Sequence, residues 1–518
     1  MHSNTEHLSQ VSSAPRLSVV VRALALASAS AMACLGAAHA FDSGSTGEDG
    51  VLNPAVTTEI TLPPSGILQY TSVNIPSGVT VSFKRNALNT PVQLLVSGDV
   101  TIAGTISLNG KDAKPTGTAG DGALGDDGLP GEGGPGGFDG GRGGKADAAS
   151  RLELIRGGTG LGPGGGKGGD ERKDGCYGGV YRHYQGLGAA YAVIGGNGYG
   201  SSWGCGSSDL LIPKSYGTAA VTPLIGGSGG GGGLGGSNYS GSGGGGGGGA
   251  ILIASSGAIN ISGVIDTTGG DGGDIAGTGA GSSGAGGSGG AIKLMASAIN
   301  GKGSLYANGG CRTSGGTRRY ECDKRYYGAS EGRIRLEADS ITFSGKSDPT
   351  YTRDMPGAVS VANAPSIRIV DIAGTPVPDT PTGNADVVLP ETITNPVVVK
   401  FATSNVPTGN TIKLRVVPAR GPAVEVLSPA ISGSAQSGTA SVSVELPQGP
   451  SVLQAITSYT VTVAQAQSLS RFAENEQVER VDLVATLGQG GSVAEIVTVS
   501  GKRYPASLAV LQLAGLAG

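Results

Sequence analysis

The segment Gly249-Ala250-Ile251-Leu252-Ile253-Ala254-Ser255 closes a run of glycine that begins at Gly243, and a similar apolar phrase follows Gly290 as Ala291-Ile292-Lys293-Leu294-Met295-Ala296. The two phrases start 41 residues apart, and a third copy, Arg333-Ile334-Arg335-Leu336-Glu337-Ala338, starts 42 residues after the second. A degenerate copy, Val92-Gln93-Leu94-Leu95-Val96, lies upstream. A fixed period of this kind indicates stacked units, none of which can bury its apolar face alone.

Each copy continues into a second apolar phrase, and these phrases begin at Val100, Ile259, Ile299 and Ile341. Residues 51–109 alternate between apolar and polar side chains with a period of two, interrupted by the turn signal Pro76-Ser77-Gly78. Short strands joined by tight turns fit this alternation. Together with the repeat, they predict an all-β fold built on a right-handed parallel β-helix. A β-sandwich is the alternative for the same residues.

Glycine dominates the middle of the chain: of 98 glycines, 75 lie in residues 117–350 and only 14 in residues 351–518. Between residues 122 and 145 glycine opens every triplet. Proline is too rare there for collagen, in which it makes up about 15–20% of residues. We therefore expect left-handed extended helices of three residues per turn, similar to polyglycine, packed through bare glycine faces and joined by backbone hydrogen bonds. A solvated flexible loop is the alternative.

A composition boundary near residue 350 divides the chain. Before it, we expect β-helix-like strands in 41–116, a glycine-rich region in 117–249, and β-helix-like repeats with glycine tracts in 250–350. After it, alternating segments separated by Pro, Gly and Asn turns predict an immunoglobulin-like β-sandwich over 351–463. Its candidate strands are 367–370, 386–389, 397–401, 411–417, 424–427, 440–446 and 456–463. Residues 464–518 are predicted to form a small β module, or alternatively extra strands on the sandwich.

The first 40 residues resemble a signal peptide, because Arg16 and Arg22 precede an Ala/Leu-rich run and the small-residue site Ala38-His39-Ala40. We therefore expect a secreted, extracellular or outer-surface protein. No later segment reaches the ~18 to 20 apolar residues that a membrane-spanning helix requires. Without residues 1–40, the net charge is −5, from 33 Lys and Arg against 38 Asp and Glu. This charge gives no indication of a nucleic-acid partner.

Four cysteines follow the signal peptide: Cys176, Cys205, Cys311 and Cys322. In an exported protein this even number indicates two disulfides, with three possible connectivities. We favour the local pairs, Cys176 with Cys205 and Cys311 with Cys322. The spacing does not fit zinc, because no two of these cysteines form a CxxC arm.

His183 is the one histidine outside the signal peptide, so Ser-His-Asp and Cys-His catalysis and His-rich metal sites would all depend on it. Carboxylate chemistry stays open, because β-helix enzymes that cut acidic polysaccharides use Asp or Glu with calcium or a basic residue. The candidates, which show no diagnostic spacing, are Asp126, Asp127, Asp139, Asp170 and Glu171. The sequence favours a protein without catalytic residues or a cofactor and leaves a β-helix lyase or hydrolase as the alternative.

Calcium is the one metal for which the chain carries a partial motif. Gly269-Gly270-Asp271-Gly272-Gly273-Asp274 matches the beginning of the calcium-binding nonapeptide repeat, GGxGxD. The motif occurs once, and Ala276 stands where a large apolar residue should follow. Asp271 and Asp274 are therefore only weak candidate calcium ligands, and solvated carboxylates are the alternative.

Aromatic and basic residues gather inside the two cysteine pairs. Six of the 28 residues between Cys176 and Cys205 are aromatic: Tyr177, Tyr181, Tyr184, Tyr191, Tyr199 and Trp203. In and just beyond the second pair lie the basic candidates Arg312, Arg318, Arg319 and Arg325. Flat rings with polar tips and a local basic patch suit contact with anionic glycans. The alternative is that the tyrosines fill core space beside glycine backbones and the arginines are solvated.

The order of signal peptide, alternating strands, glycine tracts followed by phrases such as Gly249-Ala250-Ile251-Leu252-Ile253-Ala254-Ser255, and C-terminal β-domain resembles the glycine-rich exported surface proteins of Gram-negative bacteria. The resemblance covers roughly residues 41–345 and implies no catalytic residues. The triplet-glycine tracts are also similar in pattern to phage tail-fibre tip adhesins, whose glycine helices hold binding loops at their ends. This second likeness concerns the structural arrangement and does not imply common ancestry.

These patterns lead to an expected function. We expect a secreted or surface-displayed structural or adhesive protein that presents disulfide-closed aromatic and basic loops to a polysaccharide or cell-surface glycan. We also expect that copies of the chain associate with one another in an extracellular matrix. An ice- or mineral-binding surface would require a ladder of repeated threonines, which the three in-phase copies do not supply.

Overall fold

The computed structural model describes residues 41–63, 65–86, 89–115, 128–172, 181–195, 212–275, 282–314, 317–322, 328–357, 359, 365–378, 387–473, 476–487, 492–506, 510–511 and 514–516. The chain divides into two units, Met1–Ala40 and Phe41–Gly518. The first unit coincides with the predicted signal peptide and lies outside the described residues. The second is mostly β, with stacked parallel sheets followed by antiparallel sheets and few helices.

Two parallel sheets form the first part of this unit. The nine-stranded sheet has the order β1-β4-β7-β11-β13-β17-β19, with β3 joined through β6 to β11. Its strands are β1 (Val51–Leu52), β3 (Ile67–Tyr70), β4 (Ser72–Ile75), β6 (Val92–Val96), β7 (Val100–Ile102), β11 (Ala250–Ile261), β13 (Ala291–Gly301), β17 (Arg333–Ile341) and β19 (Thr352–Asp354). The six-stranded sheet is ordered β18 (Lys346–Asp348), β14 (Ser304–Tyr306), β12 (Val264–Asp266), β8 (Thr105–Ser107), β5 (Thr80–Lys84) and β2 (Thr58–Thr61).

The repeated apolar phrases pair with one another in register. Ala250 of β11 lies opposite Ala291 of β13, which in turn lies opposite Arg333 of β17. On the other side of β11, Val92 of the degenerate copy lies opposite Ile251. The stacked units that the 41- and 42-residue spacing predicts are therefore confirmed.

The alternation of side chains in these strands separates a core from a polar outer face. The core includes Ile251, Ile292 and Ile334, at most 2% exposed, and burial of each such side chain contributes roughly 1.5–3 kcal/mol. On the outer face, Asn300 donates from Nδ2 to Oδ1 of Asn260 at 3.2 Å and accepts from Thr342 Oγ1 at 2.7 Å. This ladder gives the exposed side of each unit its own link to the next unit.

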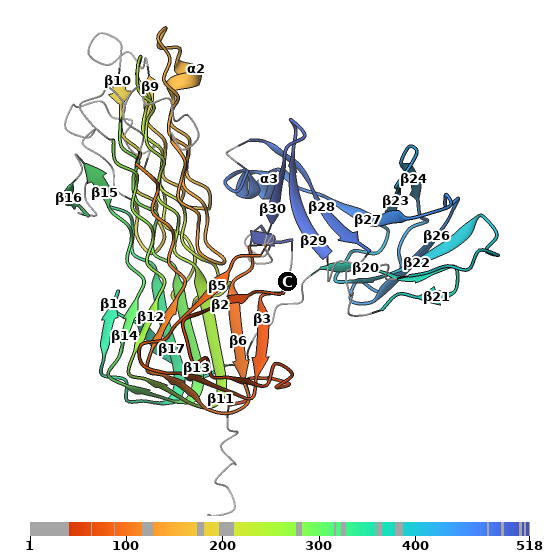
Figure 1. Cartoon of the computed structure of the whole chain (residues 1–518), viewed down its shortest axis with the longest axis horizontal. Coiled ribbons are helices and arrows are strands. Elements are labelled where there is room, and N and C mark those ends of the chain that lie inside the picture. Colours follow the sequence, from red (N-terminus) through yellow and green to blue (C-terminus); the bar gives the residue numbers. More distant parts are fainter. Residues whose placement is uncertain are drawn as a thin grey trace, which may run out of the picture. The chain divides into compact units, whose positions relative to one another are not determined.

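The glycine-rich segments continue from these strands as extended tracts joined laterally by backbone hydrogen bonds (Figure 1). We call them the glycine lattice. Its described tracts are 108–115, 128–145, 157–170, 184–191, 226–235, 241–249, 267–275, 282–290, 307–312 and 328–332. Bonds recur every third residue: Gly141 donates to Gly230 and Gly144 to Gly233, at 2.8 and 2.9 Å. The described part of the glycine-rich region is therefore ordered by its own amides and carbonyls.

Three tracts, 226–235, 241–249 and 282–290, are enclosed on every side, and we call them the central tracts. Counting 128–136 and 137–145 as separate passes of the chain, and likewise 157–162 and 163–170, each central tract bonds to at least six neighbours within the described residues. For 241–249 these neighbours are 108–115, 128–136, 137–145, 226–235, 267–275 and 282–290. A tract surrounded in this way leaves little room for side chains: residues 243–249 are all glycine, and Ala285 and Ser288 of the neighbouring tract are small.

A Cβ atom at any glycine of the central tracts would lie within 2.7 Å of a backbone atom of another segment. The closest approach is at Gly290, where the Cβ position is 1.8 Å from the carbonyl oxygen of Gly249. Glycine is thus required here by close packing between backbones, although ordering it costs on the order of 1 kcal/mol more than ordering alanine. Hydrogen bonds on all sides offset that cost.

The C-terminal part contains two antiparallel sheets. The five-stranded sheet is ordered β21 (Thr375–Pro376), β20 (Ser366–Ile372), β22 (Val397–Ser404), β26 (Gly438–Val444) and β25 (Ser432–Gly433). The six-stranded one is ordered β24 (Val424–Leu427), β23 (Lys413–Pro418), β27 (Ser451–Thr460), β28 (Val478–Thr486), β29 (Ser492–Thr498) and β30 (Arg503–Ala506). Phe401, Leu414 and Ile496, at most 1% exposed, contribute to one core between them.

Two details differ from, or refine, the sequence-based expectations. The strand predicted at 386–389 is wrong for residues 387–389, which form no strand, although their side chains alternate: Val388 is 78% exposed, while Val387 and Leu389 pack against the core. Strands β28, β29 and β30 continue the sheet of β23 and β27. Residues after 463 therefore add strands to the preceding sheet, which was the alternative to a separate β module. Between β27 and β28 lies helix α3 (Val463–Ser470), whose N-terminus is capped by Thr462 and Gln465 in a capping box.

A glycine substitution tests the packing of the lattice. The Cβ of Gly134→Val would lie 2.2 Å from the carbonyl oxygen of Leu108, whereas Glu132 in the same triplet is exposed. We expect Gly134→Val to lower the free energy of unfolding by about 1–3 kcal/mol and Glu132→Val to leave it nearly unchanged. Thermal unfolding and protease resistance of both variants measure this. Equal behaviour of the two would contradict close packing at Gly134.

The acid dependence of stability should depend on Glu476. Hydrogen bonds from Lys502 and Ser500 lower the pKa of Glu476 to about 2 from 4.5. A depressed folded-state pKa stabilises the protein above the unfolded pKa, and the contribution is lost as pH falls from about 4.5 to about 2. Glu476→Gln should therefore lower the unfolding midpoint at pH 7 and match the wild type near pH 2. A difference independent of pH would contradict this, and Glu391→Gln, at an exposed turn, is the control.

Candidate functional site

The strands β9 (Asp170–Arg172) and β10 (Tyr181–His183), between which the first cysteine loop begins, lie at the end of the glycine lattice away from the parallel strands (Figure 1). The segment before the first cysteine ends in β9, which pairs antiparallel with β10. Nearby lies the short helix α2 (Leu152–Ile155). Lys145 of the lattice donates its amide to Leu154 of α2 at 2.9 Å, which ties this helix to a tract end.

The aromatic candidates fall into three groups. Tyr177, Tyr199 and Trp203, together with Cys176 and Cys205, lie outside the described residues, so their proposed disulfide stays a prediction. Tyr181 is placed by its backbone in β10, as is the single histidine His183. Tyr184 is 47% exposed just beyond that strand and is accessible to a ligand.

Tyr191 is instead a core residue. It is 1% exposed, stacks on Tyr216 with 4.5 Å between ring centroids, and donates from its hydroxyl to the carbonyl of Ile225 at 2.8 Å. The guanidinium of Arg333 lies 5.6 Å from the centre of its ring. Burial raises the pKa of Tyr191. This tyrosine therefore fills space beside glycine backbones, the alternative that the sequence left open for it.

The second cysteine loop is a hairpin anchored in the lattice. Its predicted disulfide, Cys311–Cys322, is confirmed, with the two Cα atoms 4.4 Å apart. The hairpin consists of β15 (Arg312–Ser314) and β16 (Thr317–Glu321). At its base the amide of Cys311 donates to Oδ1 of Asp271 at 2.7 Å, and the carbonyl of Cys311 accepts from the amide of Gly272 at 2.9 Å.

The basic candidates are only partly placed. Arg318 and Arg319 lie on β16 by their backbone, and Arg325 lies outside the described residues. Arg312 at the base of the hairpin is only 5% exposed, so its guanidinium is not on the open surface.

The candidate calcium ligands take part in the lattice edge. Asp271 donates its amide to Oδ1 of Asp112 at 2.7 Å while its own Oδ1 accepts from Cys311. Asp274, 7% exposed, accepts the amide of Ile275 at 2.8 Å. These carboxylates thus bond amides at the edge of the lattice. Within the described ranges, no group of three or more His, Cys, Asp or Glu side chains is placed to hold a metal ion.

The carboxylates considered for polysaccharide cleavage are engaged with arginines where their side chains are described. Asp139 forms an ion pair with Arg85 and also accepts the amide of Gly133 at 2.8 Å. Asp170 accepts from Nε of Arg156 at 2.8 Å. Asp126 and Asp127 lie outside the described residues, and Glu171 is placed by its backbone in β9.

The structure places a tract from inside the first cysteine pair beside the tract that follows the second pair. The tract 184–191 follows β10, and the tract 328–332 follows the basic loop; the amide of Ser330 donates to the carbonyl of Ala189 at 2.8 Å. A Cβ at Gly188 would lie 2.7 Å from the carbonyl oxygen of Gly328. A tract inside the first cysteine pair and the tract after the second pair therefore lie side by side, which sequence spacing alone did not indicate.

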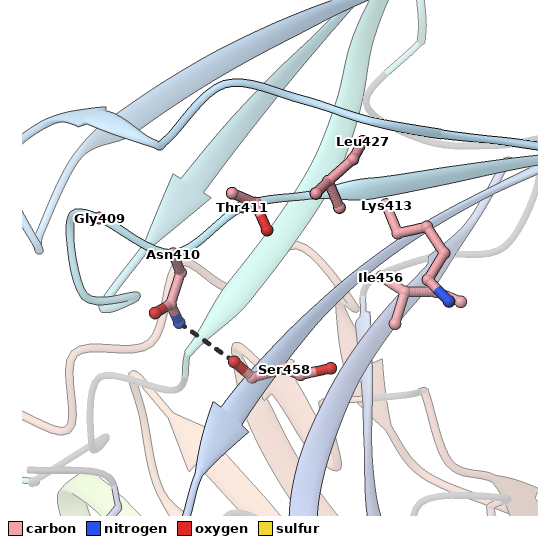
Figure 2. Close-up of a pocket in the computed structure, with 7 residues that line it drawn as sticks. All are labelled: Gly409, Asn410, Thr411, Lys413, Leu427, Ile456 and Ser458. Atoms are coloured by element: carbon pink, nitrogen blue, oxygen red, sulfur yellow. Dashed lines mark hydrogen bonds between the residues drawn. The ribbon is translucent and has the colours of Figure 1, made fainter.

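A second feature that the sequence analysis missed is a cleft of about 280 Å³ on the six-stranded antiparallel sheet (Figure 2). It is lined by the turn 409–411, Lys413, Leu427, Ile456 and Ser458. Figure 2 shows Asn410 and Ser458 close together, joined by a hydrogen bond from Nδ2 to the Ser458 carbonyl at 3.4 Å. The lining residues come from a turn and three different strands, so no local motif identifies them.

Substitution of two tyrosines distinguishes a core role from a ligand-binding role. Tyr191→Ala should lower the free energy of unfolding by about 3–5 kcal/mol, because it opens a cavity under Tyr216 and removes a buried hydrogen bond. Tyr184→Ala should leave stability within about 0.5 kcal/mol of the wild type, as for other exposed positions. Denaturant unfolding at pH 7 measures both. A Tyr191→Ala protein as stable as the wild type would contradict a core role for Tyr191.

None of the described helices is long and apolar enough to cross a membrane. Comparisons of the chain with family models, with curated proteins and with solved structures find no match.

Proposed function

We propose that the chain is a secreted or cell-surface adhesive protein that uses the glycine lattice as a rigid platform for binding loops. Its partners would be polysaccharides or cell-surface glycans, with self-association in an extracellular matrix as a further mode. The signal-peptide-like segment 1–40 and the disulfide Cys311–Cys322 support an extracytoplasmic location.

The finer architecture in this proposal has three parts. The parallel sheets form a right-handed β-helix, the hand that parallel crossovers nearly always take. The tracts of the lattice are left-handed three-residue helices similar to polyglycine, for which the three-residue recurrence of the lateral bonds is the support. The two antiparallel sheets form an immunoglobulin-like sandwich, supported by their common core.

The observation that carries the functional proposal is that the tract 184–191, inside the first cysteine pair, lies beside the tract 328–332, which follows the second pair. A loop whose ends are fixed loses less conformational freedom when it binds, so a rigid platform increases the affinity of the residues on it. The aromatic loop would supply flat rings for sugar faces, and the basic hairpin would supply guanidinium groups for carboxylate or sulfate. The chemistry of both loops together fits an anionic glycan.

Binding to an array of neutral and anionic polysaccharides tests the proposal, with the full chain after removal of residues 1–40 in its oxidised form. We expect Trp203→Ala and the double change Arg318→Ala with Arg319→Ala each to weaken binding to anionic glycans about tenfold, which corresponds to about 1.4 kcal/mol. Arg420→Ala, at an exposed turn after β23, is the matched control and should bind like the wild type.

The experiment also separates binding from folding. Weaker binding at an unchanged unfolding midpoint assigns the effect of a substitution to the binding surface rather than to folding. Glycan binding that is indifferent to all three loop substitutions would remove these loops as the binding surface. Release of cleavage products from the polysaccharides would favour the lyase or hydrolase instead.

A further inference from the structure

The cleft of Figure 2 combines a cation, hydroxyl and amide groups, and aliphatic side chains on one exposed sheet face. Pairing of the strands determines this combination. Lys413 of β23 lies directly opposite Leu427 of β24 on one side and Ile456 of β27 on the other. The next residue, Leu414, points to the other face and is fully buried. The ammonium group of Lys413 is therefore carried between two aliphatic side chains on the outer face.

Leu427 is unusually accessible for an aliphatic side chain at 60% exposure, and Ile456 is half-buried. Single exposed aliphatic residues are common on protein surfaces. Here the two flank a concave space of about 280 Å³. Ligand pockets for drug-sized molecules begin at about 300 Å³, so this space suits a smaller unit such as one sugar residue.

The charge around Lys413 is not balanced. Glu425 is the shared ion-pair partner of Lys413 at 3.4 Å and Arg415 at 3.6 Å, so two cations meet one carboxylate. All three side chains are 44–50% exposed, which leaves the pairs weak and exchangeable. This side of the cleft therefore carries an excess positive charge that can attract a second carboxylate.

The carboxylate nearest the opposite side does not cancel that charge. Ser458 donates from Oγ to Asp482 at 2.7 Å, and Asp482 is 2% exposed and paired with Arg480 at 2.9 Å and Arg503 at 3.1 Å. Asp482 is thus neutralised below the surface and orients the Ser458 hydroxyl. The Asn410 amide and the Thr411 hydroxyl complete the polar rim.

From this arrangement we propose that the cleft binds a carboxylated sugar residue, such as one uronate unit of an acidic polysaccharide. Lys413 receives the carboxylate, Asn410 and Thr411 bond the ring hydroxyls, and Leu427 and Ile456 cover the apolar face of the ring. The site lies on the C-terminal antiparallel sheet and uses none of the loop residues proposed above. It is a second, independent contact for glycans.

Titration of the full chain, without residues 1–40, with galacturonate and its oligomers tests this site. Galactose and acetate serve as probes that lack the carboxylate or the ring. We expect saturable binding of galacturonate that is stronger than that of either probe and that weakens with added salt. Galactose or acetate binding as tightly as galacturonate would overturn the proposal, because one of the two chemistries would then be unnecessary.

A charge-removing variant locates the site. Lys413→Met keeps the aliphatic stem and should weaken galacturonate binding about tenfold, the expected effect of one lost charge-assisted hydrogen bond. Lys400→Met is the matched control, since Lys400 is also an exposed lysine in an ion pair, 3.5 Å from Asp371 on the other sheet. Both variants should keep the wild-type unfolding midpoint.

The outcomes separate this site from the loops. Galacturonate binding that falls in Lys413→Met but not in Trp203→Ala supports the cleft, whatever happens to the loop proposal. Binding that falls in Trp203→Ala and is unchanged in Lys413→Met overturns the cleft and leaves the loops as the glycan-binding surface. Absence of saturable galacturonate binding in the wild type overturns the cleft as well.

Discussion

The hydrogen bond between an amide of one glycine tract and a carbonyl of its neighbour is the interaction on which the first part of the chain depends. It forms only if two backbones approach without a Cβ between them, as at Gly244, where the Cβ position is 2.0 Å from the carbonyl oxygen of Gly230. Apolar burial cannot hold such a region together, because glycine has no side chain to bury. Cooperative networks of fully satisfied backbone groups take over that role.

The parallel strands give the lattice its alignment. The central tracts 241–249 and 282–290 lead directly into β11 and β13, whose pairing places Ala250 opposite Ala291. Tracts 267–275 and 307–312 leave from β12 and β14, which also pair. The paired strands, which are held together by a conventional hydrophobic core, therefore place neighbouring tracts side by side and in phase. The near-constant period of 41 and 42 residues preserves this phase from one unit to the next.

The sequence predicted what depends on periodicity and missed what depends on distant segments. The in-phase phrases at Ala250, Ala291 and Arg333 were sufficient to predict stacking, and triplet glycine predicted lateral backbone bonds. Periodicity could not distinguish Tyr184 from Tyr191, because Tyr191 is buried by Tyr216 and Ile225, which return to it from a later loop.

The sequence also could not predict the cleft or the arrangement of the C-terminal strands. Lys413 and Ile456 meet only after β23 and β27 pair, and the residues after 463 join the sheet through β28. Both depend on contacts between segments that are separate in the sequence. Side-chain type and spacing carry no signal for such contacts.

The lattice also indicates where recognition can and cannot occur. In the central tracts, the space that each glycine leaves is occupied by another backbone of the same chain, so these glycines are accounted for without a partner molecule. The abundance of glycine thus reflects internal packing rather than an adhesive surface of bare backbone. Inside the central tracts small side chains such as Ser228, Ala285 and Ser288 are accommodated, whereas charged ones such as Glu132 and Arg142 are exposed at the periphery. Charged and aromatic side chains in this part of the protein consequently lie at the edges of the lattice and in the loops that leave it.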